Sequence, residues 1–262
     1  MAQDANRVRI RRGGKPDQLE PVLEYARRLQ DYAALAAIVY RTSDTAQVTD
    51  PPGWTRSADP LDTVDDRRTG LYYEVWEEAE WTAIVYRGTE FFSRDWWSNL
   101  RWFTRFLPVG LDQYNIVRRD VGAVVARARA RRPAARLVTV GHSLGGGLAQ
   151  QAAYAHPDID LVAAFDSSPV TGFHSVEKAD RDVNRRGILI DRAYESGEIL
   201  AFLRGFLRHF VPLSTADPLV TELRFNFRGF GFITQHSMVQ LAFDLRHAAT
   251  GAPGPGARVT KR

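Results

Sequence analysis

The residues with the clearest potential for chemistry are Gly141-His142-Ser143-Leu144-Gly145, a match to the pattern G-x-S-x-G. An apolar run at 137–140 precedes them, and a helix-forming segment with apolar positions at 148, 149 and 152 follows. A serine at a sharp turn between a strand and a helix forms a nucleophile elbow, and glycines beside it let the two backbones approach. The pattern therefore predicts that Ser143 is a nucleophile. The first N–H groups of the helix would face the oxyanion that forms during attack.

A serine hydroxyl is a poor nucleophile at neutral pH, so a general base must lie within hydrogen-bond reach. The chain has six histidines. His236 follows the last expected strand, which fits the order serine, acid, histidine found in hydrolases with this elbow. The others are expected beside the turn, at a helix end, or in loop, amphipathic and terminal segments: His142, His156, His174, His209 and His247. His236 is the predicted base.

A triad also needs a carboxylate, and three lie between Ser143 and His236 at expected strand ends. Asp166 follows the first strand after the elbow helix. Glu198 comes shortly after the next strand. Asp217 precedes Pro218, where an Asx-type turn explains it without catalysis. From the residues alone all three stay open.

Strands and helices that alternate along the chain must position these groups. The hydrophobic pattern predicts helices over 19–41, 111–132 and from about 236 to 246, and strands over 71–76, 81–86, 161–165, 187–194 and 220–228, with a polar loop at 174–186. Such alternation is typical of an α/β protein with a mostly parallel sheet flanked by helices. Residues 1–18 and 248–262, which are charged or rich in Gly and Pro, are expected to be disordered. A single domain over residues 19–247 remains.

Three motifs together carry a family resemblance. The strand at 81–86 runs into Arg87-Gly88-Thr89, then Asp95-Trp96 and Asn99-Leu100 follow, and the elbow comes next. This series resembles the class 3 (fungal-type) lipases of the α/β-hydrolase superfamily. The resemblance implies the α/β-hydrolase fold.

The resemblance also implies roles for individual residues. Thr89, through its N–H and hydroxyl, and the backbone N–H of Leu144 would form the oxyanion hole. Glu198 aligns with the triad acid, although the family more usually has aspartate there, and His236 aligns with the base. The chain would hydrolyse carboxylic esters of lipids through an acyl-enzyme on Ser143, with no metal or organic cofactor.

Other reactions of the same catalytic residues remain open, because the elbow motif does not determine which molecule accepts the acyl group. Phospholipase, thioesterase and acyltransferase activities are alternatives, and a non-catalytic lipid-binding protein is a more distant one. The aromatic and arginine-rich segments 91–107 and 200–211 fit a buried cluster, an acyl-binding wall or a contact with a lipid surface.

Composition limits the setting and the partners. The net charge of +4 comes with no aromatic-basic nucleic-acid motif, so nucleic acid is not an expected partner. No window approaches 18 consecutive apolar residues, which argues against a transmembrane segment. The basic N-terminus lacks the apolar core of a secretory signal, so a cytoplasmic location is the default expectation, with export by a signal-free route as the alternative.

Overall fold

The computed structural model describes residues 6–13, 15–88, 107–168, 170–195, 218–227 and 237–251. The strands are β1 (Arg7–Arg12), β2 (Gln18–Pro21), β3 (Thr55–Arg56), β4 (Thr63–Asp66), β5 (Leu71–Glu77), β6 (Trp81–Tyr86), β7 (Arg136–His142), β8 (Ile159–Phe165), β9 (Leu189–Glu195) and β10 (Leu219–Phe225). The helices are α1 (Val22–Ile38), α3 (Leu107–Arg131), α4 (Leu144–Ala155), α5 (Lys178–Asn184) and α7 (Met238–Ala249), with 3₁₀ turns η1 (Asp44–Gln47), η2 (Pro60–Asp62) and η4 (Phe173–Ser175).

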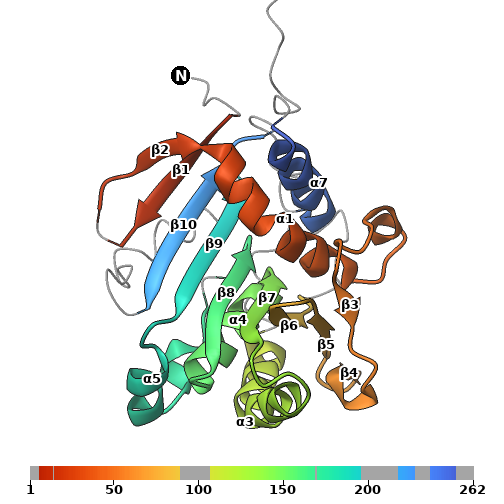
Figure 1. Cartoon of the computed structure of the whole chain (residues 1–262). Coiled ribbons are helices and arrows are strands. Elements are labelled where there is room, and N and C mark those ends of the chain that lie inside the picture. Colours follow the sequence, from red (N-terminus) through yellow and green to blue (C-terminus); the bar gives the residue numbers. More distant parts are fainter. Residues whose placement is uncertain are drawn as a thin grey trace, which may run out of the picture.

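The strands form one ten-stranded sheet in the order β2-β1-β10-β9-β8-β7-β6-β5-β3, with β4 also paired to β5 (Figure 1). Strands β6 to β10 are parallel and follow one another across the sheet in chain order. Helical crossovers make this possible: α3 joins β6 to β7, α4 joins β7 to β8, and α5 lies between β8 and β9. The predicted fold class, a mostly parallel sheet flanked by helices, is confirmed.

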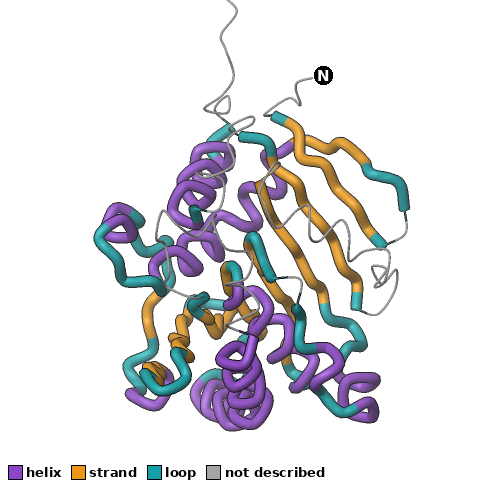
Figure 2. Tube along the Cα trace, turned by 180° about the vertical axis from the view of Figure 1, so that it is seen from behind, coloured by secondary structure: helices purple, strands orange, loops and turns teal. Residues whose placement is uncertain are grey.

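Helices pack on both faces of the central strands, and Figure 2 shows from behind that the outer strands on the N-terminal side have no helix in front of them. Helices α1 and α7 pack together on one face, over inward residues such as Val140 and Phe165. Helices α3 and α4 pack on the other face, over residues such as Leu137 and Val162. Because the central strands are buried on both faces, they appear in the sequence as continuous apolar runs, which is why they could be predicted.

The N-terminal segment forms strands where the structure describes it, so the prediction of disorder over residues 1–18 was wrong for β1 and for the start of β2. β1 adds an antiparallel strand to β10, and β2 pairs with β1. Val8 and Ile10, which alternate with arginines, are fully buried in the core beneath α1 and α7. Alternation of apolar and polar residues is typical of a half-buried strand, but the many charged residues around Val8 and Ile10 favoured a prediction of disorder.

Other differences concern short or polar elements. Residues 178–184 form α5 within the predicted loop, and Asn184 is the residue of this helix that is buried. A helix of seven residues with so little apolar surface gives no periodic signal. The first helix begins at Val22 because β2 occupies the preceding residues, and α7 extends to Ala249, two residues into the predicted disordered tail.

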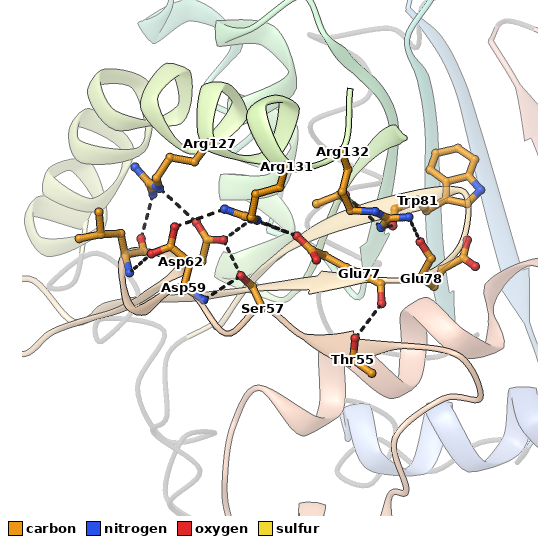
Figure 3. A network of polar contacts seen from close by, with 12 residues as sticks. Thr55, Ser57, Asp59, Asp62, Glu77, Glu78, Trp81, Arg127, Arg131 and Arg132 are labelled. Atoms are coloured by element: carbon orange, nitrogen blue, oxygen red, sulfur yellow. Dashed lines mark hydrogen bonds and ion pairs between the residues drawn. The ribbon is translucent and has the colours of Figure 1, made fainter. Parts of the chain in front are cut away.

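A polar network holds the basic end of α3 to the antiparallel part of the sheet (Figure 3). Asp62 is fully buried and accepts hydrogen bonds from Ser57 Oγ at 2.8 Å, from Arg127 Nε at 3.2 Å and from Arg131. Arg132 donates to the carbonyl of Trp81 at 2.8 Å, at the start of β6. Cations at a helix C-terminus are favoured by the helix dipole, and here they also fix the crossover into β7.

Among the helices that the structure describes, none combines the length and the apolar composition that a membrane span requires.

Candidate active site

Ser143 occupies the turn between β7 and α4, with φ 57° and ψ −122°. Its N–H donates to the carbonyl of Phe165 at 3.0 Å, and its own carbonyl accepts from the N–H groups of Gly146 at 3.1 Å and Ser168 at 2.9 Å. A non-glycine residue at such φ stores strain, and three hydrogen bonds from two elements hold it there. The strand, turn and helix therefore lie where the sequence predicted an elbow.

The glycines of the motif are required by direct contact. A Cβ added to Gly141 would lie 2.2 Å from the carbonyl oxygen of Gly145, and one added to Gly145 would lie 2.3 Å from that of Tyr86. Any side chain at these positions would force β7, the start of α4 and the end of β6 apart. The close approach brings the backbone of β6 directly beside the elbow.

Gly88, two residues after the end of β6, packs against the elbow. A Cβ on Gly88 would lie 2.6 Å from the carbonyl oxygen of His142, 2.6 Å from the hydroxyl of Tyr40 and 3.4 Å from the Cβ of Ser143. His142 itself is fully buried, and its Nδ1 forms a 2.8 Å hydrogen bond with the hydroxyl of Tyr40. Thr89, the predicted oxyanion residue, comes directly after Gly88 and lies outside the described residues.

The chain is similar to a phospholipase domain in sequence and to fungal lipases in fold. Residues 31–159, from α1 to the start of β8, match the family model of a Tle-like phospholipase domain. A lipase from Rhizopus microsporus var. chinensis superposes with a TM-score of 0.52 at 16% identity, covering 81% of this chain and 86% of that one. The native Rhizomucor miehei lipase in complex with its propeptide gives a TM-score of 0.51 at 17% identity, over 89% and 79%. The chain has a class 3 lipase-like α/β-hydrolase fold. A search of curated proteins found no match.

In this class 3 lipase-like fold, only some of the predicted site residues belong to the part of the chain that the structure describes. Ser143 and Leu144 lie at the elbow, Leu144 as the first residue of α4. Glu198, His236 and the alternative acid Asp217 fall outside the described residues, as Thr89 does. Their roles stay predictions.

Asp166, the remaining alternative acid, directly follows β8 in a fully buried position with φ 39°. Its N–H donates to the carbonyl of Ala193 at 2.9 Å. It lies between Phe165 and Ser168, both of which hydrogen-bond to the backbone of Ser143. Asp166 therefore belongs to the segment after β8 that packs against the elbow, although α4 and β8 separate the two in the sequence.

Glu195 is a further carboxylate beside the three predicted from the sequence. It is the last residue of β9, is buried, and lies opposite Phe225 of β10 at the carboxyl edge of the parallel strands. Ser143 sits at the same edge, at the end of β7. Its position directly after the predicted strand 187–194 was the available signal. Glu195 therefore joins the carboxylates to be tested as triad acid.

His156 and Asp191 are perturbed groups outside the elbow. His156 caps the far end of α4, about 18 Å along the helix from Ser143, and its Nδ1 accepts the N–H of Asp158 at 3.2 Å. Burial lowers the pKa of His156, and the nearby Arg129 lowers it further. At the far end of α4 it is too distant from Ser143 to be the base.

Asp191 lies in the middle of β9, where burial raises the pKa of its carboxyl to about 6 against the opposing effect of Arg28 on α1, 2.9 Å away. This pair links the sheet to α1.

Within the described residues no three His, Cys, Asp or Glu side chains gather as metal ligands would.

Proposed function

We propose that the chain is a serine hydrolase that cleaves carboxylic esters of lipids through an acyl-enzyme on Ser143. The observation that carries this proposal is the strained backbone of Ser143, φ 57°, at the head of α4. Nothing in the packing of a plain strand-to-helix connection calls for a serine in this conformation. A nucleophile that must project from the sheet edge does call for it.

The reaction proceeds in two halves. The Ser143 hydroxyl attacks the ester carbonyl while His236 takes its proton and passes it to the leaving alcohol. Water then attacks the acyl-enzyme, with His236 as base again. Glu198 orients the imidazole, and the N–H of Leu144 with the N–H and hydroxyl of Thr89 stabilise the oxyanion. The roles of His236, Glu198 and Thr89 rest on the resemblance to class 3 lipases.

Phospholipids are the second candidate substrate class beside acylglycerols. The match of residues 31–159 to a Tle-like phospholipase domain favours them, and that stretch contains the whole elbow. We also propose that the enzyme contacts a lipid surface, through segments 91–107 and 200–211. Apart from Leu107, both segments lie outside the described residues.

Comparing the wild type with Ser143→Ala tests the proposal. The variant should fold, since alanine fits the same backbone hydrogen bonds, yet kcat should fall by at least about 10⁴-fold. Vesicles of phosphatidylcholine, emulsified triacylglycerol and a soluble p-nitrophenyl ester would be assayed side by side. Most of the wild-type rate surviving in Ser143→Ala would refute the proposal, and the preferred lipid decides between lipase and phospholipase.

The triad acid is tested by ranking isosteric variants. Glu198→Gln should lower kcat by about 10²–10⁴-fold, because the imidazole loses its correct tautomer. Asp217→Asn and Glu195→Gln should cost far less. Whichever variant loses most activity at unchanged stability identifies the acid. A larger loss in Asp217→Asn or Glu195→Gln would show that Glu198 is misassigned.

A further inference from the structure

We propose that Tyr40 is a positioning residue that aligns Gly88, the residue before the proposed oxyanion donor Thr89, with the nucleophile elbow. The inference rests on the proposed function and adds a residue to it. Tyr40 lies far from both elements in the sequence. Its hydroxyl nevertheless contacts the residue that precedes each of them, Gly88 before Thr89 and His142 before Ser143.

Tyr40 is itself held firmly. It follows the end of α1, where its N–H donates to the carbonyl of Ala37 at 3.2 Å, and its ring is buried. The next residue, Arg41, takes a positive φ of 56° and donates from Nη2 to both carboxylate oxygens of Glu74, at 2.6 and 2.8 Å. Glu74 is fully buried on β5. A bidentate pair at a strained turn therefore anchors Tyr40 to the sheet.

The first contact of the Tyr40 hydroxyl is with the elbow. The hydroxyl lies 2.8 Å from Nδ1 of His142, and the two rings meet edge to face with centroids 5.8 Å apart. Since His142 is fully buried, this hydrogen bond is made without competition from solvent. It fixes the side chain of the residue whose carbonyl lies against Gly88.

The second contact is with the end of β6. A Cβ on Gly88 would lie 2.6 Å from the Tyr40 hydroxyl, so the backbone of Gly88 packs directly against that oxygen. The Tyr40 hydroxyl thus contacts both Gly88 and His142, at the place where Gly88 packs against the elbow. Donors of an oxyanion hole must lie within about 2.7–3.1 Å of the developing charge, so a small shift of Gly88 would weaken transition-state stabilisation.

Tyr40→Phe removes only the hydroxyl and leaves the packed ring. We expect kcat for a soluble p-nitrophenyl ester to fall about 10-fold with KM within about twofold, because the lost alignment acts in the transition state. Tyr32→Phe is the matched control. Tyr32 is also a buried tyrosine of the α1 region, but it packs edge to face against Trp54 and Trp81.

A thionoester analogue separates positioning from a merely structural effect. Sulfur accepts hydrogen bonds weakly, so an intact oxyanion hole favours the oxygen ester. The ratio of kcat/KM for the ester to that for its thionoester does not depend on how much enzyme is folded. This ratio should fall about 10-fold in Tyr40→Phe and stay at the wild-type value in Tyr32→Phe.

An unchanged ratio in Tyr40→Phe, or an equal fall in Tyr32→Phe, would overturn the inference. Ser143→Ala, assayed in parallel, keeps the two proposals distinguishable. Ester hydrolysis that survives Ser143→Ala refutes the proposed function and the inference with it. Hydrolysis that depends on Ser143, with an unchanged ratio in Tyr40→Phe, refutes the inference alone.

Discussion

Backbone strain at individual residues gathers around the elbow. Three non-glycine residues have positive φ in the described part of the chain: Arg41, Ser143 and Asp166. Ser143 is the elbow residue. Asp166 follows Phe165, whose carbonyl accepts the N–H of Ser143, and Arg41 follows Tyr40 and anchors it through Glu74. Each such conformation costs of order 1–3 kcal/mol, and it persists only where the surrounding structure imposes it. Their concentration at one edge of the sheet is what a site with a fixed geometry requires.

Ser143 could be found from sequence because its neighbours, two glycines between a strand and a helix, are specific to this turn. For Glu195 the available signal was only its position after a predicted strand, and Tyr40 had no such signal. A tyrosine at a helix end is common, and Tyr40 is singled out by its contacts with Gly88 and His142, which are distant in the sequence. Such contacts leave no local pattern in one sequence.

Asp191 yields a pH-dependent prediction. Burial raises the pKa of its carboxyl to about 6, so the folded state holds a proton that the unfolded chain releases near pH 4. This group therefore supports stability below about pH 4, and the contribution is lost as the pH rises through 6. Asp191→Asn removes the titration. The free energy of unfolding of the variant, relative to the wild type, should be about 2 kcal/mol higher at pH 7.5 than at pH 4.5.

Urea unfolding at the two pH values measures this difference. The pKa of about 6 already includes the attraction of Arg28 for the ionised carboxylate, so the expected difference between the two pH values needs no separate allowance for this pair. The same offset between variant and wild type at pH 4.5 and pH 7.5 would mean that Asp191 does not titrate in this range.

At the scale of elements, the close contact of β6, β7 and α4 determines the site. The parallel strands were predictable because burial on both faces produces apolar runs such as Leu137–Val140. β1 and α5 were missed for the opposite reason. Each buries few residues, and charged neighbours dominate their local composition.

Gly145→Ala tests the contact between these elements. The new Cβ would lie 2.3 Å from the carbonyl oxygen of Tyr86, so β6 must move away from α4. We expect a loss of about 3 kcal/mol in the free energy of unfolding, together with a lower kcat. Gly187→Ala is the control. Its Cβ would meet no atom within 4 Å, and its φ of 77° costs only about 1 kcal/mol. If both variants lose the same free energy of unfolding, the requirement for glycine at position 145 does not come from the close contact with β6.

At the scale of the whole molecule, the N-terminal hairpin extends the sheet beyond β10 and closes the core under α1 and α7. Ile10→Ala should lower the free energy of unfolding by about 2–4 kcal/mol, since Ile10 is buried to 1% exposure. Leu19→Ala, on the same hairpin but at 49% exposure, should change it by less than about 0.5 kcal/mol. Chemical denaturation compares them. If Ile10→Ala is as mild as Leu19→Ala, the first strands do not belong to the cooperative core.

The central claim is that Ser143 is an activated nucleophile. Labelling the folded wild type with a fluorophosphonate, followed by mass spectrometry of its peptides, tests it most directly. The reagent reacts with serines whose hydroxyl is activated by a base and whose oxyanion is stabilised. We predict stoichiometric phosphonylation of Ser143 in the native protein and none after unfolding in urea. A native protein that stays unlabelled, or that carries the label on another serine, would contradict the account.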